Sequence, residues 1–376
     1  MKVSVNECKL LKKDIKNVSS VMKKGWYSSA GPVIPEFESL WANYCQRQYG
    51  IAFSSGTTGL IAALNSLGLK KGDEVILPNF TIISCGLAIQ LTGATMVPVD
   101  CDSKTLNIDI DKLKLSITER TKAIVVVHIY GQPANMQEIM KISKDFKLKI
   151  IEDAAEAHGA RYLTTNNTEK VWKRCGSEGD ISVFSFYANK LISTGEGGMA
   201  LVNDYDFATK LQSLRNLGFS ENRSYKHEQF GFQFRMTSMQ AALGIPQVER
   251  MKKILEKKKH IYERYHESLK DIKSLTFLKQ EEWAKTCHWV TPIKINPDAF
   301  TVNQFRQILA KEGIETRPFF VGMHRQPIYA NEKFFQSDEF SNSDEASNQG
   351  VILPSGISTS NMQIDYVLSK IRNILE

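Results

Sequence analysis

The stretch KAIVVVHI, from Lys122 to Ile129, decides the fold of this 376-residue chain. It is a continuous apolar run, which is typical of a strand that is covered on both faces of a parallel sheet. Similar runs lie on both sides of it in the sequence and alternate with helix-like segments. The strand-like runs are 74–78 (EVILP), 95–99 (TMVPV), 147–152 (KLKIIE) and 181–186 (ISVFSF), and helical examples are 135–146 and 207–217. Alternating strands and helices predict an α/β domain with a mostly parallel sheet.

The pattern of apolar and charged residues along the sequence changes after about Gly244. The later part predicts a charged amphipathic helix over 248–269, a strand over 288–295, a helix over 302–312, a polar surface loop over 336–348 and a last helix over 361–375. The chain length also suits about two domains. We therefore expect a large α/β domain over 1–245, whose N-terminal segment is 1–31, and a smaller C-terminal α+β domain over 246–376.

Composition argues against several classes of protein. Hydrophobic residues make up 42% and charged residues 24%, and no stretch approaches the ~20 apolar residues of a membrane span. The N-terminus lacks the features of a signal peptide, so we expect a cytoplasmic protein without membrane association. The six cysteines show no CxxC spacing, which argues against a metal site or a disulfide framework. The charge of +7 comes without a zinc finger or an aromatic-basic repeat, so no nucleic acid partner is expected, although an anionic small substrate would be attracted.

Ligands of open α/β sheets bind at the carboxyl ends of the strands, where three segments would converge. The first is SSGTTG, 54–59, which precedes the helical run 60–67. Small hydroxyl residues and glycines at a helix N-terminus form an anion site, because free N–H groups and the helix dipole favour phosphate. The alternative is an ordinary N-cap. The chain has neither GxxxxGK[ST] nor GxGxxG, so a P-loop nucleotide or a Rossmann dinucleotide is not expected.

The second segment is EDAAEAHG, 152–159, in which Asp153 directly follows a buried strand. A carboxylate there is costly unless it meets a cation or strong donors. The pyridine nitrogen of pyridoxal phosphate (PLP) is such a cation, and it must stay protonated for the ring to withdraw electrons. Glu156 would then reach a ring substituent. The alternative reading makes Asp153 the N-cap of a helix.

The third segment is SFYANK, 185–190, followed by TGEGGM, 194–199. Lys190 follows a buried strand and precedes a glycine-rich turn that permits close backbone approach. Lysine forms a Schiff base with PLP, and a desolvated amine is a better nucleophile. A lysine taken alone is nearly always a surface residue. The combination of the phosphate loop, Asp153 and Lys190 therefore predicts a PLP enzyme with Lys190 as its catalytic residue.

At these motifs the sequence resembles the DegT/DnrJ/EryC1/StrS family of PLP-dependent sugar aminotransferases. The resemblance covers nearly the whole chain and includes SSGTTGL, GDEVILP, IEDAAEAHGA, FSFYANKLISTGEGGM and FRMTSMQAALG. The pattern ETRP at 315–318, with His324 and PIY at 327–329, is typical of the members that make GDP-perosamine. The resemblance implies a fold-type I aminotransferase with a mixed, mostly parallel seven-stranded sheet flanked by helices. It also implies a homodimer with active sites at the subunit interface.

The same resemblance assigns roles to site residues. Lys190 would form the Schiff base, Asp153 would face the pyridine nitrogen and Glu156 would contact the ring hydroxyl. The residues implied to hold the phosphate are Ser55, Gly56, Thr57 and Ser185. Those implied to lie near the sugar nucleotide are Tyr27, Ser28, Ser29, Arg317, His324 and, from the partner subunit, Arg223 and Tyr225. No metal ligand is expected.

Two positions depart from the family's pattern. The family usually has an aromatic residue that stacks on PLP where this chain has Ile82, which can pack on the ring without π-stacking. It often has an asparagine that reaches the neighbouring subunit's phosphate where this chain has Gln233. The longer amide of Gln233 would do the same.

The expected reaction is a ping-pong transamination. L-glutamate gives its amino group to PLP and leaves as 2-oxoglutarate, and a nucleotide-linked 4-keto-6-deoxy sugar then receives the amino group. The resemblance favours GDP-4-keto-6-deoxy-D-mannose, which would give GDP-perosamine for O-antigen or another surface glycan. A UDP- or dTDP-4-keto-6-deoxy-glucose-type sugar is the alternative. A sugar dehydratase is disfavoured because such relatives carry His in place of the lysine, and a PLP-binding regulator is disfavoured because no DNA-binding segment is present.

Overall fold

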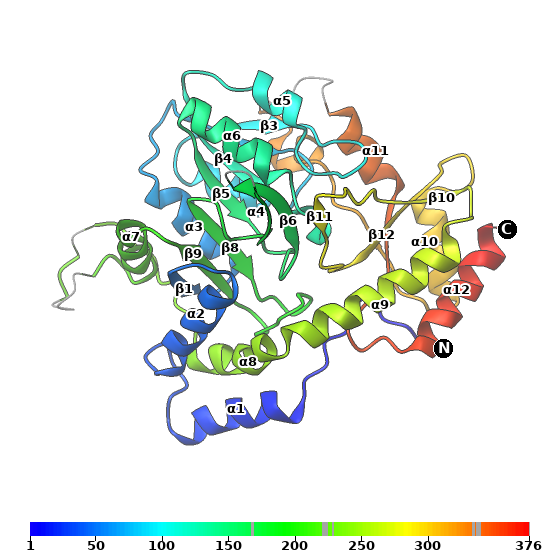
Figure 1. Cartoon of the computed structure of the whole chain (residues 1–376), viewed down its shortest axis with the longest axis horizontal. Coiled ribbons are helices and arrows are strands. Elements are labelled where there is room, and N and C mark those ends of the chain that lie inside the picture. The colour runs from blue at the N-terminus through cyan, green and yellow to red at the C-terminus, as the bar shows by residue number, and fades with distance from the viewer. Residues whose placement is uncertain (167–168, 220–224, 228, 333–334, 336–339, 376) are drawn as a thin grey trace.

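The computed structural model contains a central sheet of seven strands in the order β1-β9-β8-β5-β4-β2-β3 (Figure 1). The description covers residues 1–375 apart from 167–168, 220–224, 228, 333–334 and 336–339. The strands are β1 (Tyr49–Phe53), β2 (Glu74–Pro78), β3 (Thr95–Val99), β4 (Thr121–Val127), β5 (Lys149–Asp153), β8 (Ile181–Ser185) and β9 (Gly198–Val202). Only β9 runs antiparallel to its two neighbours. The predicted mixed, mostly parallel seven-stranded sheet is therefore confirmed.

Helices cover both faces of this sheet, which explains why its central strands are apolar throughout (Figure 1). They are α2 (Val33–Tyr44), α3 (Gly56–Ser66), α4 (Ser84–Gln90), α5 (Ile110–Leu115), α6 (Met136–Phe146), α7 (Tyr205–Arg215) and α8 (Ser238–Glu249). Side chains of β4 such as Ile124 and Val125 are fully buried between the layers. The N-terminal helix α1 (Lys12–Lys23) packs against α8 on the outside of the molecule.

A second, smaller unit contains an antiparallel sheet in the order β10-β12-β14-β13. Its elements are β10 (Leu275–Phe277), β12 (Thr291–Ile295), β13 (Arg317–Pro318), β14 (Gly350–Leu353), α9 (Met251–Leu269), α10 (Val302–Lys311) and α12 (Asn361–Leu375). They share their own hydrophobic cluster, in which Val3 of the N-terminal segment also packs, whereas Trp289 and Phe319 pack into the core of the large unit. The division of the chain into 1–245 and 246–376 stays a prediction.

Some connecting elements have no counterpart in the sequence pattern. A three-stranded sheet, β11-β6-β7, lies beside the large unit and consists of β6 (Arg161–Asn166), β7 (Glu169–Arg174) and β11 (Ala284–Lys285). Short 3-10 turns are η1 (Ile129–Gly131), η2 (Met323–Arg325) and η3 (Pro327–Tyr329). Because β11 comes from the second half of the chain, it joins the two units.

Two predicted boundaries were wrong. The helix expected over 248–269 is the end of α8 and the whole of α9, which meet at Arg250. There the backbone leaves helical geometry, and the guanidinium binds both carboxylate oxygens of Asp14. The strand expected over 288–295 begins only at Thr291, because His288 has a left-handed φ of 51° that ends any extended run.

The prediction of a surface loop over 336–348 was also wrong for the part of this range that the structure describes. Residues Ser341–Gln349 form helix α11, and residues 336–339 lie outside the described part. The carboxylate of Asp100, just after β3, accepts the backbone N–H of Asn342 at 3.0 Å and of Ser343 at 2.9 Å. A helix N-terminus needs such acceptors, and this one comes from a distant part of the sequence.

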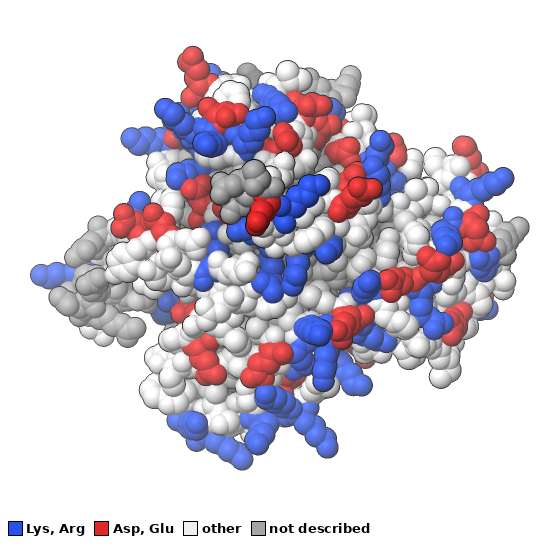
Figure 2. All heavy atoms as spheres, in the orientation of Figure 1, with Lys and Arg blue, Asp and Glu red and all other residues white. Residues whose placement is uncertain are grey.

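Charges of both signs are interspersed on the face shown in Figure 2, with lysines gathered along its lower edge over α1. In the parts of the chain that the structure describes, no helix has the length and apolar character needed to cross a membrane.

Candidate active site

The carboxyl ends of β5 and β8 and the N-terminus of α3 surround a cavity of about 360 Å³. It contains most of the residues that the sequence singled out. Among its lining residues are Ser55, Gly56, Thr57, Ile82, Asp153, Glu156, Ser185, Lys190 and Arg317. Residues that the sequence did not single out also line it, among them Ser84, Asn189, Trp289 and Phe320. No three His, Cys, Asp or Glu side chains within the described ranges lie close enough together to hold a metal ion.

The anion site predicted at SSGTTG is built by close approach of two loops. Ser55 is the N-cap of α3, and its hydroxyl accepts the N–H of Thr58 at 3.1 Å. A Cβ on Gly56 would lie 2.9 Å from Cβ of Ser185, so only glycine lets the end of β8 approach the helix this closely. The hydroxyl groups of Thr57 and Ser84 are 2.9 Å apart. Free N–H groups and hydroxyls therefore gather at the positive end of a helix dipole.

Asp153 ends β5, and its carboxylate is buried in the cavity wall. One oxygen accepts the N–H of Ala155 at 3.0 Å and the other accepts the thiol of Cys85 at 3.2 Å. Burial raises the pKa of Asp153, and these two donors oppose the rise. Residues 154–160 form turns, so the alternative in which Asp153 caps a helix is wrong. A cation facing this carboxylate would offset the cost of burying it.

Glu156 lies three residues further on and is also buried. One of its oxygens accepts the N–H of Tyr130 at 2.8 Å, and the other lies 3.6 Å from Nζ of Lys190. Burial raises the pKa of Glu156 to about 7, although the positive charge of Lys190 opposes this rise. The carboxyl group therefore holds or releases a proton near neutral pH, next to the lysine amine.

Lys190 lies in the loop between β8 and β9, and its side chain is only 10% exposed. The loop is fixed by backbone hydrogen bonds, including one from Lys190 to the carbonyl of Tyr187 at 2.9 Å. The amine lies 3.9 Å from the ring centroid of Trp289, which the sequence did not reveal as a site residue. Trp289 belongs to an apolar stretch, and only the docking of the smaller unit brings it to the lysine.

Several predicted residues do not line the cavity of the single chain. Tyr27 and Tyr225 are 62% and 87% exposed. Ser29 and Gln233 both contact Arg235: the hydroxyl accepts from its guanidinium at 3.2 Å, and the amide oxygen accepts its N–H at 3.2 Å. The carbonyl of Ser28 accepts the N–H of Ser238 at the start of α8. Arg223 lies outside the described residues.

His324 is likewise absent from the cavity lining. Its ring nitrogens lie 2.9 Å from the amide nitrogen of Asn79 and 3.2 Å from the carboxylate of Asp344, and its ring stacks on Phe340. Burial lowers the pKa of His324, although Asp344 opposes this. In this chain His324 joins η2 to α11 and to the end of β2, and its role near a sugar nucleotide stays a prediction.

One cavity thus offers a helix N-terminus with hydroxyls, a buried carboxylate and a buried primary amine. Asn189 adds an amide oxygen that is buried there without a hydrogen-bond partner among the described residues. This donor set fits PLP, which combines a phosphate, a protonated ring nitrogen and an aldehyde. The fold and the site together define a fold-type I PLP enzyme.

Comparison with known proteins gives the family. The model of the DegT/DnrJ/EryC1/StrS aminotransferase family matches residues 9–372, and the chain belongs to this family. It is 37% identical to the GDP-perosamine synthase of Caulobacter vibrioides, over 95% of this chain and 94% of that protein. It is 35% identical to the GDP-perosamine synthase of Escherichia coli O157:H7, over 98% and 97%. The solved structure of S. venezuelae DesV has a TM-score of 0.88 at 29% identity and covers 96% of this chain and 94% of that one. The protein is therefore a PLP-dependent sugar aminotransferase.

Proposed function

We propose that this aminotransferase moves the amino group of L-glutamate to C4 of GDP-4-keto-6-deoxy-D-mannose and so makes GDP-perosamine. The observation that carries the proposal is the match, over nearly the full length of both chains, to relatives named GDP-perosamine synthase. The cavity with Lys190 and Asp153 supports it, since the chemistry needs an amine, an anion site and a buried carboxylate in one place.

In this proposal the cavity residues hold PLP. Ser55, Gly56, Thr57 and Ser185 bind its phosphate at the N-terminus of α3. Asp153 faces the ring nitrogen, Glu156 the ring hydroxyl, and Ile82 packs on a face of the ring. When bound, PLP supplies an aldehyde that takes up amino groups and a ring that withdraws electrons from the substrate carbon.

Lys190 is the catalytic residue of the proposal. Its amine would hold the cofactor and, when free, would take a proton from the substrate carbon and return one. Glu156 holds a proton beside this amine, which its pKa of about 7 allows at neutral pH. Asp153 would stay ionised with PLP bound, because the protonated ring nitrogen of the cofactor would offset the burial of the carboxylate. Because the side chain of Lys190 is only 10% exposed, little bulk water reaches the amine during the proton transfers.

The substrate side of the proposal involves a second subunit. Arg317, an exposed residue at the cavity, attracts the negatively charged diphosphate. Five further predicted residues do not line the chain's own cavity, and four of them are exposed, namely Tyr27, Ser28, Tyr225 and Gln233. The fifth, Ser29, is partly buried against Arg235. We place them, with Arg223, at the site of a partner in a homodimer, where Gln233 binds the partner's cofactor phosphate.

A panel of three keto sugars tests the substrate. The purified protein, saturated with PLP and L-glutamate, would receive the GDP-linked 4-keto-6-deoxy-mannose and the UDP- and dTDP-linked 4-keto-6-deoxy-glucose. We expect the highest kcat/KM for the GDP sugar, with an equal amount of 2-oxoglutarate formed. A higher kcat/KM for either glucose-type sugar contradicts the proposed substrate and leaves the aminotransferase class intact. The Lys190→Ala variant is the control and should show no turnover with any sugar.

A further inference from the structure

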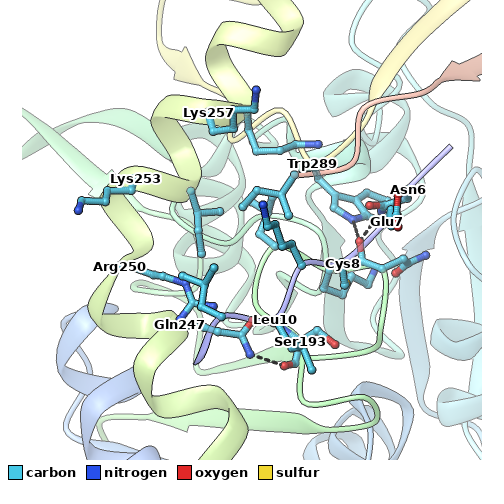
Figure 3. Close-up of a pocket in the computed structure, with 18 residues that line it drawn as sticks. Asn6, Glu7, Cys8, Leu10, Ser193, Gln247, Arg250, Lys253, Lys257 and Trp289 are labelled. Carbon is cyan, nitrogen blue, oxygen red and sulfur yellow. Dashed lines mark hydrogen bonds between the residues drawn. The ribbon is translucent and has the colours of Figure 1, made fainter. Parts of the chain in front are cut away.

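A second cavity, of about 240 Å³, is lined in part by the loop that carries Lys190 (Figure 3). Its walls come from the N-terminal segment 6–11, the loop 189–193, the end of α8, the start of α9 and Ile357. It shares three residues with the active-site cavity, namely Asn189, Lys190 and Trp289. Trp289 and the lysine loop therefore separate the two spaces.

The indole of Trp289 contacts the lysine loop in two ways. Its Nε1–H donates to the carbonyl of Asn189 at 2.8 Å, drawn as a dashed line in Figure 3. The face of its ring lies 3.9 Å from Nζ of Lys190, measured to the centroid. Trp289 is 5% exposed, so both contacts are shielded from water.

The same indole is tied to the carboxyl group beside the amine. It stacks on Tyr130, with ring centroids 6.4 Å apart and an interplanar angle of 27°. Tyr130 in turn donates its backbone N–H to Glu156, and its left-handed φ of 53° fixes that N–H. Trp289, Tyr130 and Glu156 therefore form one connected set of groups around the lysine amine.

Among the described residues, Glu156 and Trp289 lie next to this amine. Glu156 lies at 3.6 Å, longer than a direct hydrogen bond, and its own charge changes near neutral pH. The negative face of an indole attracts the ammonium form of the lysine whether Glu156 is charged or neutral, and more strongly where water is excluded. The indole is therefore the partner of the protonated lysine that does not depend on the charge of Glu156.

We propose that Trp289 is a positioning residue whose indole face holds the protonated Lys190 amine while that amine is not bonded to the cofactor. The proposal rests on the proposed function, in which the amine leaves the cofactor in each half-reaction and must stay close enough to move a proton. The hydrogen bond from Nε1 to Asn189 keeps the loop, and with it the lysine backbone, at a fixed distance from the ring.

Chemical labelling of the full chain without cofactor tests this contact directly. Limiting acetic anhydride at pH 7.5 would label the lysines, and mass spectrometry would give the ratio of Lys190 to Lys253, an exposed lysine that points away from the cavity in Figure 3. In Trp289→Met, which keeps bulk but has no ring, we expect the ratio to rise about fivefold. In Trp289→Phe, which keeps a ring face, it should stay within about twofold of the wild type.

Two results would overturn the proposal. An unchanged labelling ratio in Trp289→Met would show that the indole does not shield the Lys190 amine. An equal rise of the ratio in Trp289→Phe and Trp289→Met would show that the effect comes from the lost Nε1 hydrogen bond. Incorporation of 5-fluorotryptophan into the unaltered sequence covers the case in which Trp289→Met does not fold. Fluorine weakens the ring face and keeps the shape and the N–H, so labelling of Lys190 should again rise, and no rise counts against the proposal.

Steady-state kinetics test the role of Trp289 independently of which sugar is the substrate. With saturating PLP and any sugar that the wild type aminates, Trp289→Met should form the visible cofactor band and lower kcat about tenfold, with KM changed less than twofold. A change in KM alone contradicts a role in placing the amine. The labelling result needs no substrate, so it stands whichever sugar the wild type prefers.

Discussion

At the residue scale, the active site depends on buried groups whose charge is set by their neighbours. Asp153, Glu156 and Lys190 are largely buried polar side chains, and among the described residues each contacts one or two neighbouring groups. Burial raises the pKa of Asp153 and of Glu156, so a cation bound beside either carboxyl group has a large effect on its charge. Two predictions follow from their particular contacts.

The thiol of Cys85 is expected to support PLP binding through Asp153. Burial raises the pKa of Cys85 well above its usual value, so the thiol stays protonated and donates to the carboxylate at 3.2 Å. Cys85→Ala removes this donor and should weaken PLP binding about fivefold, which is the loss of one modest hydrogen bond. Cys85→Ser should stay within about twofold. Titration of the visible cofactor band measures both, with Cys45→Ala as the control, since Cys45 is a buried cysteine at the C-terminal end of α2.

Glu156 should make the cofactor-free protein less stable as the pH rises. Its pKa is raised from 4.5 to about 7, because the folded protein favours the neutral carboxyl group. This contribution to the free energy of unfolding is complete below pH 4.5 and is lost as the pH rises through 7. Glu156→Gln has no such charge. Relative to the wild type it should gain roughly 3 kcal/mol of unfolding free energy between pH 4.5 and pH 8. Urea denaturation at several pH values measures the difference, and a constant difference across this range contradicts the prediction.

At the element scale, the site depends on which ends of strands and which starts of helices can pack closely against one another. The start of α3 meets the end of β8 only because Gly56 has no side chain, and Asp100 completes the N-terminus of α11 across a long stretch of sequence. Apolar periodicity predicts the strands, but the capping of α11 could not be predicted, because its acceptor is 243 residues away.

Gly56→Ala should disturb the anion site without unfolding the chain. The added Cβ would lie 2.9 Å from Cβ of Ser185 and push apart the two loops that are proposed to bind the phosphate. We expect PLP affinity to fall at least about tenfold, since contacts from both loops are lost together. Gly68→Ala at a surface turn, where the added Cβ meets nothing but the φ of 68° strains the backbone, is the control for general destabilisation outside the site. Equal PLP affinity in Gly56→Ala and the wild type contradicts this role of the close approach.

At the scale of the whole molecule, two units and a proposed second subunit meet at the lysine. The smaller unit contributes Trp289 and Arg317 to the cavity of the large one. The residues around Arg235 face outward, which is where a partner's site would be completed in the homodimer that we propose.

Mixing inactive subunits tests whether the sites are shared. Lys190→Ala chains lack the amine, and Gln233→Ala chains are expected to bind the partner's phosphate poorly. If Gln233 serves the partner, a mixed dimer has one site with both defects and one intact site, so unfolding and refolding the two variants together should restore PLP binding and turnover. If Gln233 serves its own chain, no intact site forms and mixing restores nothing. Each variant mixed with itself is the control.

The family resemblance implied the seven-stranded sheet, whereas the sequence by itself determined the alternation of strands and helices and the three segments that meet in the cavity. It could do so because burial on both faces of a parallel sheet requires continuous apolar runs, and because ligands gather at strand ends. Only the tertiary structure decided that Trp289 and Cys85 contact Lys190 and Asp153. These residues lie in apolar stretches that look like ordinary core, and what distinguishes them is a contact across 68 to 100 residues, which no local pattern records.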